Sequence, residues 1–238
     1  MKTTHPTELN KIYQIPSPEE LREEGSVILV NKPMTWSSFD VVKKIRIHFG
    51  VKKVGHAGTL DPMATGLLII CTGKKTKEMH RFVNLEKEYI GVMVLGAKTL
   101  SYDSETEITE TGDVTNISLS DIQSVFNEFT GALQQKPPIY SALKYGGKPL
   151  YKYARTGLSL ELKAREVFVK ELEIINFNIP EIKFRAVCSK GTYIRSLVND
   201  IGLRLGCGAY LKSLDRIRIG DYNLADAFTI EELTARNN

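Results

Sequence analysis

The segment at residues 55–67, GHAGTLDPMATGL, constrains this chain more than any other. It places three glycines and one proline within thirteen residues. Glycine reaches backbone angles closed to other residues and proline fixes its own, so this composition demands a tightly shaped loop. Such a loop would hold Asp61 beside backbone that a ligand can approach closely. Because an aspartate before a proline is also common in ordinary turns, the residues alone leave a catalytic and a structural Asp61 both open.

Apolar patterning on both sides of this loop predicts an α+β fold. Residues 27–30 form an apolar run typical of a buried strand, and residues 182–188 alternate apolar with polar side chains. Ser37 and Ser120 have the pattern of helix N-caps, and a third helical stripe covers residues 194–205. Since strands and helices follow no regular alternation, we expect a central, mainly antiparallel or mixed sheet with flanking helices.

Charge is distributed unevenly, although the net charge is only +4. Residues 43–98 and 131–155 carry net charges of +7 and +5, whereas residues 101–130 carry seven acids and no base. Basic surface of this kind suits a polyanion such as RNA, and an unevenly charged solvated surface is the alternative. We expect the acidic stretch at residues 103–113 to be a disordered excursion.

Residues 134–157 have a composition of their own. Four tyrosines are interleaved there with five basic side chains, among several prolines and glycines. Aromatic rings can stack on splayed-out bases while the cations meet phosphates. The composition therefore favours RNA binding over an ordinary long loop with partly buried tyrosines.

Signals for a metal, a cofactor or export are missing from the sequence. The three cysteines and four histidines show no ligand spacing, which argues against a zinc site or disulfides and favours a reducing cytoplasm. Residues 72–76, TGKKT, depart from a phosphate-binding P-loop, which requires glycine at position 68 and Ser or Thr at position 75. No apolar run approaches the roughly 20 residues that span a bilayer. We therefore expect a cytoplasmic protein that uses no metal and no cofactor and contacts no membrane.

The loop motif resembles the active-site motif of the TruB family, the bacterial tRNA pseudouridine synthases. Further segments resemble family motifs in the family's order, namely NKP at residues 31–33, KEY at 87–89, KPPIYSALK at 136–144, CSKGTYIR at 188–195 and the region at 211–218. These motifs cover most of the chain. The resemblance implies a pseudouridine synthase fold.

The same resemblance implies a domain organisation. A catalytic domain is expected over residues 25–238, after an N-terminal extension at residues 1–24. A thumb-like segment that grips RNA is expected as an insertion at about residues 134–157. We expect no C-terminal RNA-binding domain of the PUA type, which many family members carry, because the chain ends about twenty residues after the last motif.

The resemblance also implies an isomerase that converts uridine-55 in the T-loop of tRNA to pseudouridine. The base is flipped out, its N1 bond to the ribose is broken, and the base is turned and rejoined through C5. By family likeness Asp61 is the nucleophile, and whether it attacks the sugar or the base stays open. Arg195 matches the residue that pairs with this aspartate, and a neighbouring cation would keep the pKa of the carboxyl low. Without the resemblance, an arginine there suits a surface or a helix terminus.

Five more positions are carried over from the family. Tyr89 matches the tyrosine that stacks on the flipped base, and Tyr193 and Leu214 match other pocket residues. His56 matches the histidine that fills the space of the displaced base. Lys32 matches a lysine near the active site that supports the catalytic loop. Core packing is the alternative role for Tyr89, Tyr193 and Leu214.

The expected partner is tRNA, bound through its T-arm by a monomer without an obligate protein partner. Two alternatives stay open. One is a tRNA-folding chaperone that acts independently of catalysis, and the other is a synthase for a different RNA.

Overall fold

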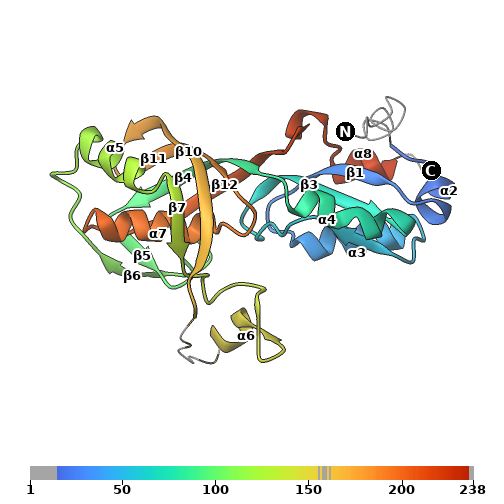
Figure 1. Cartoon of the computed structure of the whole chain (residues 1–238), viewed down its shortest axis with the longest axis horizontal. Coiled ribbons are helices and arrows are strands. Elements are labelled where there is room, and N and C mark those ends of the chain that lie inside the picture. The colour runs from blue at the N-terminus through green and yellow to red at the C-terminus, as the bar shows by residue number, and fades with distance from the viewer. Residues whose placement is uncertain (1–14, 155, 157–159, 161, 236–238) are drawn as a thin grey trace. The chain divides into compact units, whose positions relative to one another are not determined.

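The computed structural model describes residues 15–154, 156, 160 and 162–235. Helices and strands are distributed over two compact units (Figure 1). Unit 1 contains the chain up to residue 89 and again from residue 215, and unit 2 contains residues 90–214. Strands β4 (Lys87–Leu95) and β12 (Ala209–Ile219) each contribute residues to both units.

Unit 1 is built around strand β3 (Thr65–Thr72), which is almost entirely buried. Strands β1 (Val27–Lys32) and β2 (Val54–His56) pair with it in antiparallel fashion, while β12 pairs with it in parallel at Asp215 and Arg216. The predicted mixed sheet is therefore confirmed. The unit's other elements are α2 (Pro18–Glu23), α3 (Ser38–His48), η1 (Gly73–Glu78), α4 (Met79–Val83), β13 (Tyr222–Asn223), η2 (Leu224–Asp226) and α8 (Ile230–Ala235).

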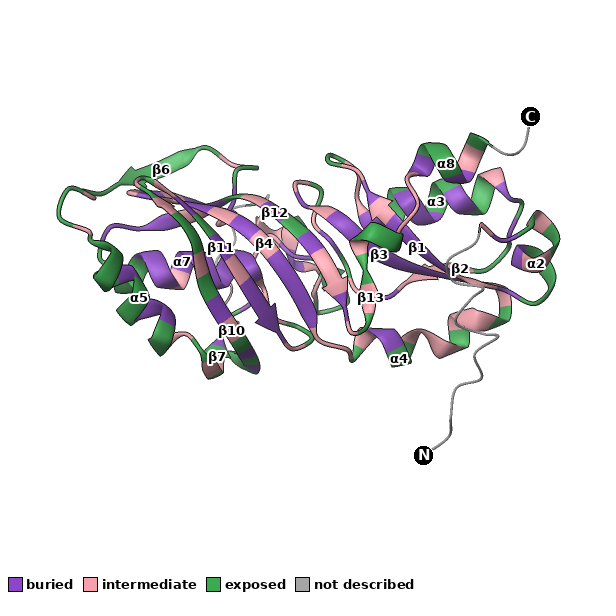
Figure 2. Cartoon of the chain, turned by 90° about the horizontal axis from the view of Figure 1, so that it is seen from above, coloured by how far each residue is buried: buried purple, intermediate pink, exposed green. Residues whose placement is uncertain are grey.

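Helix α3 covers one face of this sheet because its apolar residues recur at helical spacing. Val41, Val42 and Ile45 are buried in one cluster with residues of β1 and β3, whose strands are buried along most of their length (Figure 2). The predicted N-cap is confirmed. The Ser37 hydroxyl accepts from the Asp40 amide, and the Asp40 carboxylate accepts from the Ser37 amide, which completes a capping box.

Unit 2 contains the antiparallel strands β10 (Arg165–Asn178) and β11 (Glu181–Cys188), and β7 (Gly131–Gln135) pairs with β10. Within this unit the strand order is β12-β4-β11-β10-β7. Its main helices are α5 (Leu119–Glu128) and α7 (Ile194–Arg204). The strands and helices expected from apolar spacing are thus present, and the α+β fold with flanking helices is confirmed.

Two expectations for unit 2 were wrong. Helix α5 is capped by Ser118 and not by Ser120: the Ser118 hydroxyl accepts from the Asp121 amide, and the Asp121 carboxylate accepts from the Ser118 amide. The acidic stretch is folded and not disordered: β5 (Ala97–Thr99) pairs with β6 (Ile108–Thr111), and Asp103 between them is fully buried.

The expected thumb contains a short hairpin and a helix. Strands β8 (Lys144–Tyr145) and β9 (Lys148–Pro149) lead into α6 (Leu150–Ala154). The rings of Tyr145 and Tyr153 meet edge to face, with centroids 6.1 Å apart. Residues 155 and 157 of the expected segment lie outside the described residues. Among the described residues, no helix is long and apolar enough to cross a bilayer.

Candidate active site

Asp61 lies on a loop of unit 1 that we call the Asp61 loop, residues 57–65. Leu60 and Ala64 are buried at 3% and 0% exposure, while Asp61 between them is partly exposed. The Ala64 amide donates to the Asp61 carbonyl at 3.1 Å, which closes a tight turn. The loop is thus anchored by apolar side chains on both sides of a carboxylate that reaches the surface.

Arg216, on strand β12, fixes this loop from one side. Its side chain is 1% exposed. Its guanidinium donates to the carbonyls of Leu67 at 2.7 Å, Gly58 at 3.1 Å and Thr59 at 3.4 Å. One cation therefore holds both the entry and the exit of the Asp61 loop. Sequence reasoning missed Arg216, although its position two residues after the apolar Leu214 in a strand predicts that it points inward.

The other side of the loop is held by the segment that follows β1. Lys32 is fully buried, and its ammonium group donates to the carbonyl of Trp36 at 2.5 Å and that of Pro62 at 3.5 Å. The Ser38 hydroxyl donates to the Leu60 carbonyl at 3.0 Å and accepts from the Leu60 amide at 2.8 Å. These contacts give a physical basis for the expected supporting role of Lys32. Ser38 was not anticipated, because its neighbour Ser37 already accounted for the helix cap.

His56 ends strand β2 just before the Asp61 loop. Burial, and then the positive charge of Arg216, lower the pKa of this imidazole below its ordinary value of 6.5. His56 is therefore neutral at pH 7. A neutral imidazole can lie against an uncharged base without carrying a buried charge.

The lowered pKa of His56 predicts a pH dependence of stability. The unfolded chain takes up a proton near pH 6.5, whereas folded His56 resists it, so stability is present above that pH and is lost as pH falls toward the folded-state pKa. His56→Gln should flatten the fall in free energy of unfolding between about pH 7 and pH 5, by up to roughly 1.4 kcal/mol per pH unit. Urea unfolding at several pH values measures this. His80→Gln, at an exposed position, is the control, and parallel curves for His56→Gln and the parent would contradict the prediction.

Tyr193 and Arg195 lie together in unit 2, at the start of α7. The side chain of Gln135, on β7, accepts from the Tyr193 amide at 2.7 Å and donates to the Tyr193 carbonyl at 3.1 Å. The Ser196 hydroxyl donates to the Lys136 carbonyl at 3.0 Å. The start of α7 is therefore hydrogen-bonded to β7 and to Lys136, the residue that follows β7.

Arg195 is buried in the first turn of α7, so of its two alternative positions the surface is wrong and the helix terminus is right. Its side chain is 3% exposed, and its Nη1 lies 3.2 Å from Oδ2 of Asp103. The guanidinium also donates to the carbonyls of Ser101 at 3.1 Å and Tyr140 at 3.0 Å. Asp103 was missed by sequence reasoning, because it looked like one more acid in a charged stretch. A buried ion pair of this kind fixes the direction of the guanidinium.

The expected site residues are divided between the units. Tyr89, at the end of unit 1, is 8% exposed, and Leu214, at the end of unit 2, is 7% exposed. Lys32, His56 and Asp61 belong to unit 1, and Tyr193 and Arg195 belong to unit 2. The pairing of Asp61 with Arg195 stays a prediction. In the part of the chain that the structure describes, no cluster of three or more His, Cys, Asp or Glu side chains could hold a metal ion.

Comparison with models of known families shows which family the chain belongs to. A model described as TruB family pseudouridylate synthase (N terminal domain) matches residues 46–194, and one described as tRNA pseudouridylate synthase B C-terminal domain matches residues 195–238. The chain belongs to the TruB family. It is accordingly an isomerase, as its resemblance to the family's motifs implied.

Two curated TruB relatives match over nearly their whole length. The tRNA pseudouridine synthase B of Phocaeicola vulgatus is 49% identical over 215 residues, covering 88% of this chain and 92% of that protein. The tRNA pseudouridine synthase B of Flavobacterium johnsoniae is 47% identical over 221 residues, covering 90% of this chain and 96% of that protein.

Solved structures support the same fold. A chain in a Cbf5-Nop10-Gar1 complex is 29% identical with a TM-score of 0.71, over 92% of this chain and 56% of that one. A chain in an H/ACA RNP bound to a substrate RNA containing 2'-deoxyuridine is 26% identical with a TM-score of 0.69, over 94% of this chain and 56% of that one. This chain therefore spans little more than half the length of these structural relatives, and the pseudouridine synthase fold is confirmed.

Proposed function

We propose that this TruB protein converts uridine-55 in the T-loop of tRNA to pseudouridine, with Asp61 as the nucleophile. The observation that carries the proposal is the Asp61 loop, in which Asp61 is partly exposed and Arg216 and Lys32 hold backbone carbonyls on both sides of it. A nucleophile must be held in one position to attack one bond. The names of the TruB relatives supply the choice of tRNA as substrate.

The proposed reaction requires the protein to position the reacting groups and to keep the attacking carboxylate ionised. The bond from uracil N1 to C1' of the ribose breaks, the base turns, and a bond from C5 to C1' forms. Whichever atom Asp61 attacks, its carboxylate must be ionised, and we assign Arg195 as the cation that favours that form. Burial of Arg195 against Asp103 supports this assignment, since a preorganised cation costs no reorganisation during the reaction.

The flipped base requires a pocket that compensates for lost stacking in the RNA. We assign Tyr89 to stacking on the base, with Tyr193 and Leu214 as further walls. The neutral His56 takes the space that the base leaves. Each of these four roles is an assignment by family motif, and their partial or full burial suits side chains that close on an apolar ring.

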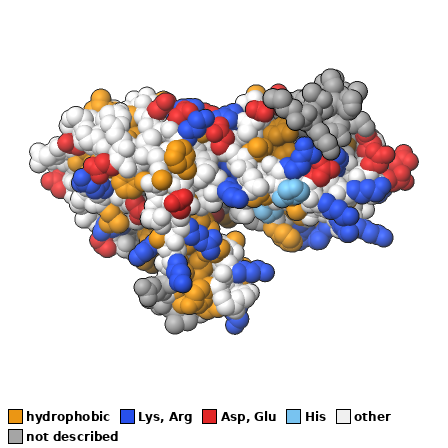
Figure 3. All heavy atoms as spheres, viewed as in Figure 1, with side chains coloured by type: hydrophobic (Ala, Val, Ile, Leu, Met, Phe, Trp, Pro, Cys, Tyr) orange, Lys and Arg blue, Asp and Glu red, His pale blue; other side chains and the backbone are white. Residues whose placement is uncertain are grey.

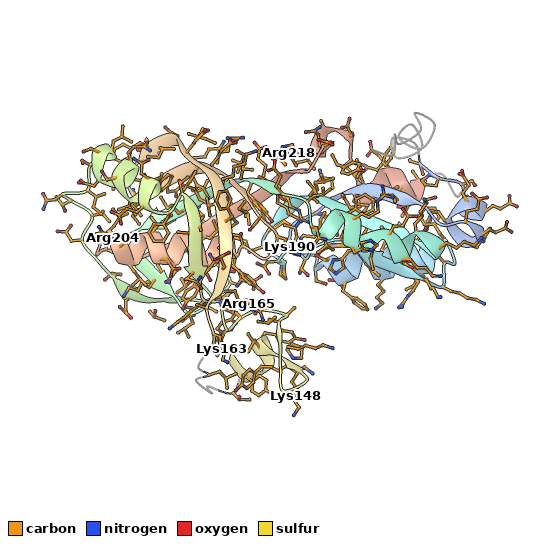
Figure 4. The ribbon with its side chains drawn as sticks, viewed as in Figure 1. Lys148, Lys163, Arg165, Lys190, Arg204 and Arg218 are labelled. Carbon is orange, nitrogen blue, oxygen red and sulfur yellow. The ribbon has the colours of Figure 1, made fainter. Side chains whose placement is uncertain are left out.

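The thumb supplies the contact to the T-arm in this proposal. The segment contains the tyrosine pair of β8 and α6, and Figure 4 labels Lys148 on β9 and, at the base of the segment, Lys163 just before β10 and Arg165 at its start. Cations beside aromatic rings suit a folded RNA loop, whose phosphates and splayed bases they can meet at once. We further propose a cytoplasmic monomer without an obligate protein partner.

Mapping of pseudouridine tests the proposal directly. Unmodified tRNA incubated with the purified protein, without added metal or cofactor, should gain one pseudouridine, at position 55. Selective chemical labelling with primer extension locates it. A tRNA with cytidine at position 55 is the control and should gain none. Modification at other positions or in other RNAs would refute the assigned target, and no modification at all would favour the chaperone alternative.

A further inference from the structure

Unit 1 has a hollow that the proposed chemistry does not use. It has a volume of about 560 Å³ and is lined by residues that precede α3 and residues on its outer face, namely Thr35, Trp36, Asp40, Lys43, Lys44, Ile47 and His48. A volume of this size is in the range that takes a small ligand or one nucleotide. We call it the α3 pocket.

The aromatic surface of the α3 pocket comes from Trp36, the only tryptophan of the chain. Part of this side chain packs against the buried cluster below α3, so the ring is held in place. The residue before it, Thr35, has a φ of 70°, in the left-handed region that non-glycine residues rarely adopt. Its amide donates to the Pro62 carbonyl at 2.8 Å, so the turn that presents Trp36 is tied to the Asp61 loop.

The polar surface of the pocket combines two cations with one carboxylate. Lys43 and Lys44 are exposed, and neither forms an ion pair or side-chain hydrogen bond with the described residues. Figure 3 displays Lys and Arg side chains gathered over α3 and its neighbours. The Oδ2 of Asp40 serves the capping box, and its Oδ1 takes no side-chain hydrogen bond from the described residues. A fixed indole ring, two available cations and a carboxylate acceptor thus share one hollow.

We propose that the α3 pocket binds one nucleotide of the substrate RNA, outside the position that is isomerised. The base stacks on Trp36, its amino group donates to Asp40, and the neighbouring phosphates meet Lys43 and Lys44. An acidic peptide would engage the lysines but would gain nothing from a stacking surface and would meet the Asp40 carboxylate, so RNA fits the lining better. The choice of RNA rests on the proposed function.

Because Trp36 is the chain's only tryptophan, its fluorescence reports on this pocket alone. The probe is a single-stranded oligoadenylate, which offers an amino-bearing base and contains no uridine to isomerise. Titration with it should quench Trp36 fluorescence. Lys43→Glu/Lys44→Glu should remove the quenching, raise the Kd at least about tenfold, and reduce the slope of log K against log salt by about 1.4, at roughly 0.7 per phosphate.

Three further variants separate binding from folding. Lys170→Glu/Lys183→Glu reverses the same charge at two exposed positions of β10 and β11 and should bind oligoadenylate like the parent. Trp36→Phe retains an aromatic ring against the core, whereas Trp36→Leu removes it. In fluorescence anisotropy with labelled oligoadenylate, the Leu variant should lose about tenfold in affinity and the Phe variant less.

The outcome is independent of turnover. Absence of quenching, or unchanged affinity in Lys43→Glu/Lys44→Glu, would overturn the inference even if the parent protein modifies tRNA at position 55. Conversely, lysine-dependent quenching in a protein that forms no pseudouridine would refute the proposed function and leave the α3 pocket as an RNA-binding site.

Discussion

Asp61→Asn should abolish pseudouridine formation while tRNA binding is retained. The substitution keeps the shape of the side chain and removes the negative charge, so the loop contacts made by Arg216 and Lys32 through backbone carbonyls are preserved. Loss of a nucleophile costs on the order of 10⁶ in kcat in a well-studied protease, and we expect turnover here to fall below detection. Release of tritium from 5-tritiated uridine in tRNA measures it, and filter binding measures affinity.

Asp113→Asn is the matched control, since Asp113 is exposed and lies in unit 2. It should turn over tRNA at the parent rate. Measurable turnover by Asp61→Asn would refute the assignment of Asp61 as the nucleophile. A synthase-deficient strain that carries Asp61→Asn also tests the chaperone alternative, because any growth advantage it restores cannot come from catalysis.

Asp103→Ala should lower the free energy of unfolding strongly, because it removes one partner of a buried ion pair. Arg195 would keep its buried charge but lose the carboxylate 3.2 Å away. Removing one partner of a buried ion pair costs about 3–5 kcal/mol. Urea unfolding followed by circular dichroism measures this as a fall in the denaturation midpoint. We also expect turnover to fall, because the Arg195 guanidinium is then held by the carbonyls of Ser101 and Tyr140 without the Asp103 carboxylate.

Two control variants separate the effect of the buried ion pair from that of removing a charge at an exposed site. Asp113→Ala, in the same acidic stretch but exposed, loses the hydrogen bonds that Thr115 donates to it and should lower the free energy of unfolding by about 1 kcal/mol. Asp103→Leu/Arg195→Met removes both charges and should recover much of the stability, though not the activity. Equal stability of Asp103→Ala and Asp113→Ala would contradict a structural role for the buried carboxylate.

Local patterns in the sequence predicted most of the elements but not the long-range polar contacts. The capping box of α3 could be read from Ser37 and Asp40, because a cap involves residues three apart. At α5 a cap-and-partner pattern is present twice, as Ser118 with Asp121 and as Ser120 with Gln123, so the local pattern alone does not choose between them. By contrast, Asp103 is separated from Arg195 by more than 90 residues, and its burial depends on a partner that no local pattern indicates.

The features of the candidate site also include some that local patterns predict and others that depend on residues far apart in the sequence. The glycine-rich composition of residues 55–67 predicted a shaped loop with Asp61 at its surface, and the family motifs supplied the remaining residues. The clamp on that loop could not be read locally, since Arg216 reaches the Leu67 carbonyl from 149 residues further along the chain. Only the strand periodicity around Leu214 hints that this arginine points inward.

That sequence separation has a consequence for biosynthesis. Unit 1 is discontinuous, and the part of β12 that carries Arg216 is translated after the whole of unit 2. A nascent chain on the ribosome therefore holds an Asp61 loop without its arginine until residue 216 has left the exit tunnel. Closure of such a distant contact is slow compared with local folding. The Asp61 loop is therefore completed among the last events of synthesis, so a chain released before residue 216 contains Asp61 but lacks the arginine that holds its loop.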